Sequence, residues 1–203
     1  EKYPNIHYFV LPQNSGPAVA RTEAMKRATG KYMAFLDSDD VWAPDKLEKQ
    51  IAFMKKTGAK FCATAYGWMD HDGKDMHTIF VPPKKTDYNK MIRLSNPIGN
   101  SFVMYDQDAL GKFEVPPIRK RNDFALWLRI LKKTDYCYGM EEVLGTYRMG
   151  RPGSVSSNKL KQGKFHWQLY HEIEGHSVIR SLYELGCWAW VKGTGIGIDK
   201  RKV

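Results

Sequence analysis

Three carboxylates fall within four positions early in the chain, at Asp37, Asp39 and Asp40. They directly follow an apolar run, residues 32–36, which predicts a short strand buried on both faces. Acids at the carboxyl end of such a strand lie where open α/β sheets bind their ligands. Because neighbouring carboxylates repel one another, a positive partner is expected, and a divalent cation with oxygen ligands suits them best.

A plainer interpretation is that these acids cap the next helix. Apolar residues recur at helical spacing over residues 44–57, and acids before a helix often cap it or interact favourably with its dipole. Capping accounts for Asp39 or Asp40, but not for three acids at the end of an apolar strand. We therefore favour the cation site.

Two further charged residues have a chemical and a structural interpretation. Arg21 lies in the first turns of a predicted helix, where a cation opposes the helix dipole, so an anion facing it would explain its position. A solvated arginine is an equally open alternative. Asp123 follows the basic residues 119–121 and lies in the first turn of another helix, with Asn122 as the expected cap. It is a candidate general base, although position alone favours a dipole partner.

Composition narrows the class of protein. The chain has 203 residues, enough for one domain with a sizeable core. A net charge of +10 implies anionic partners, namely phosphate-bearing ligands, an acidic membrane surface or nucleic acid. Three widely spaced cysteines argue for a reducing compartment without disulfides. Since no apolar run is long enough to span a bilayer, we expect a soluble or peripheral protein.

The rest of the chain alternates strand and helix patterns. A DHDG turn at residues 70–73 predicts a hairpin, and His71 there is expected to be exposed rather than a metal ligand. Residues 159–191 form a long helical pattern with expected breaks at Gly175 and Gly186. Its aromatic residues suit either a membrane interface or packing on the domain or on a second copy. Further expected elements are strands at 6–11, 60–66, 76–81 and 101–105, helices at 17–30, 88–94 and 124–133, and a strand pair at 136–140 and 143–147.

Four motifs together resemble one known family. They are NSGPAVARTEAMKRATGKYMAFLDSDDVWAPDKL from Asn14, NSFVMY from Asn100, RKRNDFALWLRI from Arg119 and YRMGRPGSVSSNK from Tyr147. In this order and spacing the chain resembles the family 2 glycosyltransferases of the GT-A fold. Many of these inverting enzymes build bacterial capsule, exopolysaccharide or teichuronic acid chains.

The resemblance implies an α/β fold with a Rossmann-like mixed sheet flanked by helices. It assigns residues 1–157 to a partial GT-A domain and residues 158–192 to a C-terminal amphipathic helical region, and residues 193–203 are expected to be a disordered tail. Family members open with a strand, a helix and a second strand ending in Asp-Asp-Gly-Ser. Nothing here corresponds, so we expect a fragment that lacks the N-terminal strands of the fold and part of the nucleotide site.

The resemblance also implies the roles of the donor-side residues. Asp37 and Asp39 match the DXD motif of the family, in which Asp39 would bind Mg²⁺ or Mn²⁺ and Asp37 would lie near the ribose or the metal. Arg21 matches an arginine beside the nucleotide. Arg148 and Arg151 fall in the loop that closes over the diphosphate of the nucleotide-sugar donor.

The acceptor side is implied in the same way. Asp123 matches the catalytic carboxylate, and Asn122 stands where Glu is common in the family. Asn100 and Trp127 are, with Asn122, candidates for acceptor-binding or supporting residues.

The expected protein is therefore a metal-dependent inverting glycosyltransferase acting on a saccharide or lipid-linked saccharide. It would be cytoplasmic, peripheral at the inner face of the membrane, able to form a homodimer and without nucleic-acid function. The alternative is a non-catalytic sugar-nucleotide-binding or truncated GT-A domain. A nucleic-acid module has only the net charge in its favour, because the basic and aromatic residues show no RNA-binding spacing.

Overall fold

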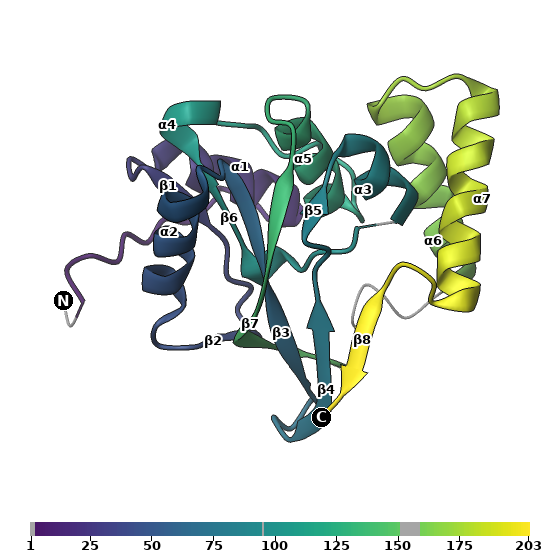
Figure 1. The fold of residues 1–203 in the computed structure, drawn as a ribbon. Coiled ribbons are helices and arrows are strands. Elements are labelled where there is room, and N and C mark those ends of the chain that lie inside the picture. The colour runs from purple at the N-terminus through teal and green to yellow at the C-terminus, as the bar shows by residue number, and fades with distance from the viewer. Residues whose placement is uncertain (1–2, 95, 151–158) are drawn as a thin grey trace.

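The computed structural model describes residues 3–94, 96–150 and 159–203. Its centre is a mixed sheet in the order β1, β6, β3, β4, β8, as Figure 1 shows. These strands are β1 (Tyr32–Ala34), β6 (Val103–Asp106), β3 (Phe61–Met69), β4 (Asp75–Val81) and β8 (Asp199–Lys202). A long strand, β7 (Cys137–Arg148), pairs parallel with β3 and antiparallel with β2 (Val41–Trp42) and β5 (Lys85–Thr86).

Helices cover both faces of the sheet, as expected for the α/β class. They are α1 (Gly16–Arg27), α2 (Lys46–Thr57), α3 (Tyr88–Leu94), α4 (Gln107–Leu110), α5 (Asn122–Leu131), α6 (Lys159–Trp167) and α7 (Val178–Thr194), with a 3₁₀ turn at Asn100–Phe102 and a π-helix at Gln168–Ile173. In Figure 1, α6 and α7 stand side by side at one end of the molecule, and the two helices are in contact.

Strand β3 is buried on both faces because each of its faces carries part of the core. Phe61 and Ala63 belong to the main core, which is built around α5, whereas Cys62 packs with Met54 of α2 on the other face. This alternation has the period of two expected along a strand. Helix α5 is almost wholly buried, since its exposure is confined to Asp123 and Arg129.

Two expected strands differ in the structure. Residues 6–11 are not in a sheet, and Ile6, Tyr8 and Val10 are exposed. The strand before the acids has only three residues and pairs on one side, with β6, so it lies at the edge of the described sheet. Met33 and Phe35 are buried on one face, Tyr32 and Ala34 on the other face are partly buried against the cluster around Met54, and Leu36 is exposed. Burial on both faces therefore holds only in part for this run.

The expected strand pair at 136–140 and 143–147 is one continuous strand, β7. Its pairing with β3 shifts register beside Thr64 and Ala65, so the irregularity interrupts the ladder without turning the chain. A Cβ at Gly139 would lie 2.3 Å from the carbonyl oxygen of Pro83, and one at Gly145 would lie 2.6 Å from that of Val41. These two glycines therefore let neighbouring backbone approach β7 closely.

The C-terminal region matches the sequence pattern only in part. The helical pattern breaks at Gly175, which has φ +72°, but Gly186 lies inside α7. The last residues are not wholly disordered as expected, because β8 pairs antiparallel with β4. None of the helices in the described part of the chain has both the length and the apolar character needed to cross a bilayer.

Candidate functional site

Arg21 joins two segments that carry predicted site residues. Its Nη2 donates to Oδ1 of Asp37 at 2.6 Å, and its Nη1 donates to Oδ1 of Asn122 at 2.7 Å. Helix α1 places the guanidinium, which is one-fifth exposed, between the acidic loop and the start of α5. The cation near the N-terminus of α1 thus faces an anion, which offsets its unfavourable position on the helix dipole.

Asp37 is also held by one further segment of the chain, the 3₁₀ turn Asn100–Phe102. Its Oδ1 also accepts a hydrogen bond from Nδ2 of Asn100 at 3.0 Å, and its backbone N–H donates to Oγ of Ser101 at 3.0 Å. Asn100 and Ser101 both belong to the 3₁₀ turn before β6. Two charge-assisted hydrogen bonds on one oxygen fix the carboxylate while leaving 36% of the side chain exposed.

Asp40 anchors the acidic loop from inside. Its Oδ2 accepts from Oγ of Ser101 at 2.5 Å, and its Oδ1 accepts from the backbone N–H of Arg148 at 3.0 Å. Burial raises the pKa of Asp40, and these two hydrogen bonds act in the opposite direction. Asp40 therefore ties the acids to the end of β7 rather than presenting its charge to a ligand.

Arg148 holds the acidic loop against the β3–β4 hairpin. Its Nε donates to the carbonyl oxygen of Asp39 at 3.0 Å, and its Nη1 donates to that of His71 at 3.0 Å. A diphosphate would have to compete with these carbonyls, so the diphosphate role of Arg148 stays a prediction. Arg151 lies outside the described residues.

Asp123 lies in the first turn of α5 and is half-buried. Its Oδ2 accepts a hydrogen bond from Nδ2 of Asn96 at 3.1 Å. The N-cap of α5 is Arg121, with φ +64°, whereas Asn122 is the first helical residue, so the expected cap was placed one residue late. Because Asn122 also binds Arg21, the predicted base is one residue along the chain from the network that holds Asp37.

Trp127 has no access to an acceptor. It is fully buried and packs against Phe35, at 5.5 Å between ring centroids, and Phe61, at 5.7 Å. Of the two roles expected for this residue, acceptor contact is therefore wrong and support of the site through the core remains.

The oxygen atoms at the end of β1 fit a hard divalent cation. Asp39 is half-buried beside Asp37. Oδ1 of Asn100 is buried and has no hydrogen-bond partner among the described residues, although Nδ2 of the same amide binds Asp37. A buried acceptor oxygen without a donor is costly, and a cation or a ligand hydroxyl would satisfy it. Carboxylate and amide oxygens are the ligands that Mg²⁺ and Mn²⁺ prefer.

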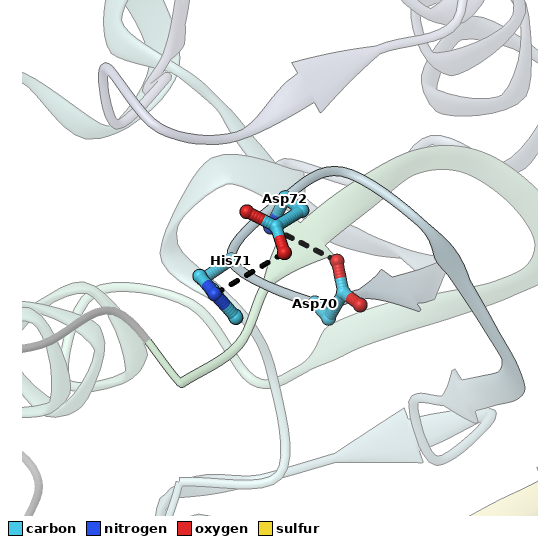
Figure 2. A group of neighbouring side chains, drawn as sticks. All are labelled: Asp70, His71 and Asp72. Atoms are coloured by element: carbon cyan, nitrogen blue, oxygen red, sulfur yellow. Dashed lines mark hydrogen bonds and ion pairs between the residues drawn. The ribbon is translucent and has the colours of Figure 1, made fainter.

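A second group with metal-ligand chemistry lies in the β3–β4 turn. One ligand atom each of Asp70, His71 and Asp72 lies within 4.8 Å of the others. Figure 2 shows the imidazole of His71 pointing toward the carboxylate of Asp72, 3.2 Å from Nε2 to Oδ2. Oδ1 of Asp70, however, accepts from the backbone N–H groups of Asp72 and Lys74, and these bonds lower its pKa, that from Lys74 most. The turn itself thus accounts for Asp70, and His71 is exposed as expected.

Sequence analysis missed Asn96 and Ser101. Asn96 has φ +64°, a conformation in which Asn is far commoner than most residues, and this orients its amide toward Asp123. The run Asn96-Pro-Ile-Gly-Asn has the composition of a loop, but proline and glycine signal a turn without showing which distant residue it meets.

The protein-family model described as "Glycosyl transferase family 2" matches residues 1–114 of the sequence. The chain is 41% identical over 196 residues to the "Putative teichuronic acid biosynthesis glycosyltransferase TuaG" of Bacillus subtilis (strain 168), covering 97% of this chain and 75% of the relative. It is 36% identical over 174 residues to the "UDP-Glc:alpha-D-GlcNAc-diphosphoundecaprenol beta-1,3-glucosyltransferase WfgD" of Escherichia coli, covering 84% and 66%.

Solved structures share the fold. The crystal structure of S. aureus TarS 1-349 in complex with UDP-GlcNAc matches with a TM-score of 0.54 at 15% identity, over 86% of this chain and 52% of that one. A second crystal structure, of S. aureus TarS 1-349, also matches with a TM-score of 0.54, at 14% identity over 92% of this chain and 55% of that chain. The chain therefore spans about half the length of these structures.

Proposed function

The chain belongs to glycosyltransferase family 2, and from that membership we propose that it transfers a sugar from a nucleoside diphosphate to an acceptor hydroxyl with inversion at the anomeric carbon. One observation carries the proposal. Arg21 binds Asp37 on one side and Asn122 on the other, so a single side chain joins the predicted donor residues to the helix that bears Asp123.

Asp39 and Oδ1 of Asn100 are the groups we assign to a divalent cation. Bound there, the cation would neutralise negative charge on the diphosphate of the donor. Arg21 contributes fixed positive charge beside the same carboxylates, in a site where groups need not reorganise as charge develops.

Asp123 is the proposed general base. Its carboxylate accepts the proton of the acceptor hydroxyl as the acceptor oxygen forms its bond to the anomeric carbon. The bond from that carbon to the diphosphate oxygen breaks on the opposite face, and the nucleoside diphosphate leaves with the electron pair. An α-linked donor would thus give a β-linked product. Asn96 orients the carboxylate through its hydrogen bond to Oδ2.

The proposed acceptor is a saccharide, or a saccharide linked to a lipid, in bacterial surface polysaccharide synthesis. Support comes from two relatives, one named for teichuronic acid biosynthesis and one for a diphosphoundecaprenol acceptor. The net charge of +10 suits both a diphosphate donor and an anionic membrane surface. We accordingly place the protein at the cytoplasmic face of the membrane.

Donor turnover tests the proposal. The chain would be titrated calorimetrically with UDP and GDP in the presence and absence of Mn²⁺, and then incubated with UDP-glucose and UDP-N-acetylglucosamine. We expect one of the two nucleotides to bind in a metal-dependent way. The matching nucleotide-sugar donor should then be turned over, with release of the free nucleoside diphosphate. Tight binding without turnover over hours, with a saccharide acceptor present, would instead identify a non-catalytic binding domain.

A further inference from the structure

Helix α7 exposes an apolar stripe. Ile179, Leu182, Tyr183 and Trp190 have exposed fractions of 82%, 55%, 59% and 63%. Their spacings of three, one and seven residues place them on one face of a helix. Four large apolar side chains in one exposed row are more than the single residues that any protein surface carries.

The opposite face of α7 packs on the domain through polar as well as apolar residues. Ser181 and Glu184 are buried, and Glu184 accepts hydrogen bonds from Nδ1 of His176 at 2.7 Å and Nε of Arg180 at 3.0 Å. A helix that serves only its own domain turns its apolar stripe to the core. Helix α7 does so only in part, because Val191 is buried and Leu185 packs against the main core, while the four residues of the outer stripe stay uncovered in the described part of the chain.

The stripe borders a hollow with a volume of about 530 Å³. Leu94 at the end of α3, Trp190 of α7 and Ile196 contribute apolar walls, and Arg93 adds a cation to the lining. Arg93 donates through Nε to the carbonyl oxygen of Asn89 rather than to a carboxylate, so its charge is not neutralised there. The hollow therefore offers apolar surface next to a positive charge.

Basic residues continue around this edge. A second hollow shares Leu94 and Gly197 with the first and is lined by Lys84, Lys90 and Arg201. Its two acids are already paired, Glu141 with Lys84 and Asp199 with Arg201. These pairs neutralise Lys84 and Arg201, so the excess positive charge beside the stripe comes from Lys90 and Arg93, which donate to backbone carbonyls. This excess complements the anionic headgroups of a bilayer.

We propose that the stripe of α7, with the adjoining hollow and its basic edge, docks on the surface of an anionic lipid bilayer. Apolar residues on one face with cations beside them are the pattern of interfacial helices. The proposal deepens, and rests on, the membrane contact assigned above. Leu94 lines the hollow and Asn96, two residues further on, binds Asp123, so a lipid-linked acceptor held at this surface would have its saccharide near the proposed base.

Vesicle flotation tests the docking surface. The chain would be mixed with vesicles of phosphatidylglycerol or of phosphatidylcholine at low and high salt. We expect flotation with phosphatidylglycerol that weakens as salt screens the charges. The combined variant Ile179→Ser, Leu182→Ser, Trp190→Ser should bind about tenfold more weakly or worse, since these side chains would no longer insert.

A matched control replaces three apolar residues exposed elsewhere, as Met76→Ser, Tyr136→Ser, Val143→Ser, and should float like the unaltered chain. Circular dichroism and thermal unfolding establish that both variants fold. Equal flotation of both variants would overturn the proposal. So would light scattering that shows a dimer lost in the α7 variant with lipid binding unchanged, because the stripe would then be an interface between copies. Turnover with a water-soluble saccharide acceptor is measured in parallel, and its absence would count against the proposed function rather than against docking.

Discussion

Nη2 of Arg21 lies 2.6 Å from Oδ1 of Asp37, and the same guanidinium reaches Asn122 through Nη1. The planar fork of arginine allows these two hydrogen bonds at once, which a single ammonium group cannot reproduce in the same geometry. The relative position of the acidic loop and α5 therefore depends on one side chain of α1.

Arg21→Lys should weaken this connection while keeping the charge. We expect a loss of about 1–2 kcal/mol in the free energy of unfolding, after allowance for the partial exposure of Asp37, and a fall in transfer rate of about tenfold or more. Urea titration and steady-state rates would measure both effects. Arg27→Lys is the control, because Arg27 pairs with Glu23 on the exposed surface and should cost less than about 0.5 kcal/mol. Equal losses in the two variants would contradict the bridging role.

Metal dependence should follow Asp39 and not the hairpin turn. Asp39→Ala is expected to abolish both the Mn²⁺ requirement and donor binding, since the carboxylate we assign to the cation is gone. Asp72→Ala removes an acid of the exposed turn and should leave both properties unchanged. Calorimetric titration of each variant with donor, with and without Mn²⁺, makes the comparison. The reverse pattern would move the metal site to the turn.

Lys46 is buried without a carboxylate partner in the described part of the chain. Its Nζ donates to Oε1 of Gln50 at 2.7 Å and lies 4.2 Å from the ring centroid of Trp42. Burial lowers the pKa of Lys46 from 10.5 to about 8. Between these values the folded chain has released a proton that the unfolded chain still binds, so stability rises with pH across this window.

Lys46→Met should remove this pH dependence. Relative to the variant, the unaltered chain should gain about 3 kcal/mol of unfolding free energy between pH 8 and pH 10.5, as expected for a pKa difference of this size. Urea unfolding at several pH values, with the difference between the two proteins plotted, isolates Lys46 from other titrating groups. Parallel curves would mean that Lys46 keeps an ordinary pKa in the folded state.

Local patterns in the sequence predicted much of the fold. The helix at residues 88–94 was predicted to the residue, and α2 ends at Thr57 as predicted, with Gly58 at φ +70° as its C-cap. The acidic motif and Asp123 were found because carboxylates at a strand end and at a helix start are visible in the order of residues alone. What ties them together was not visible, because Arg21 is 101 residues from Asn122 and Asp37 is 63 from Asn100.

The errors share a physical origin in tertiary contacts. Residues 6–11 have the composition of a strand but no strand pairs with them in the described chain. The tail is rich in glycine and lysine, yet residues 199–202 gain order from the free edge of β4. Strand formation depends on the available partner more than on intrinsic preference, so neither outcome is readable from local sequence.

Gly139 and Gly186 should respond in opposite ways to alanine. A Cβ at Gly139 meets the backbone of Pro82 and Pro83, which cannot move aside cheaply, so Gly139→Ala should lose about 2 kcal/mol or more of stability. Gly186 lies within α7 with nothing within 4 Å of its Cβ position. Gly186→Ala should therefore be neutral or stabilising by up to about 1 kcal/mol. Thermal unfolding of both variants checks this, and similar destabilisation would contradict the close approach at β7.

The most direct measurement is the rate of sugar transfer by Asp123→Asn, taken together with its affinity for donor and Mn²⁺. The substitution preserves the size of the side chain but removes its capacity to accept a proton at neutral pH. If Asp123 is the general base, transfer falls by about 10²–10⁴-fold while metal-dependent donor binding is retained. Transfer at the rate of the unaltered chain, with donor binding equally intact, would contradict the account.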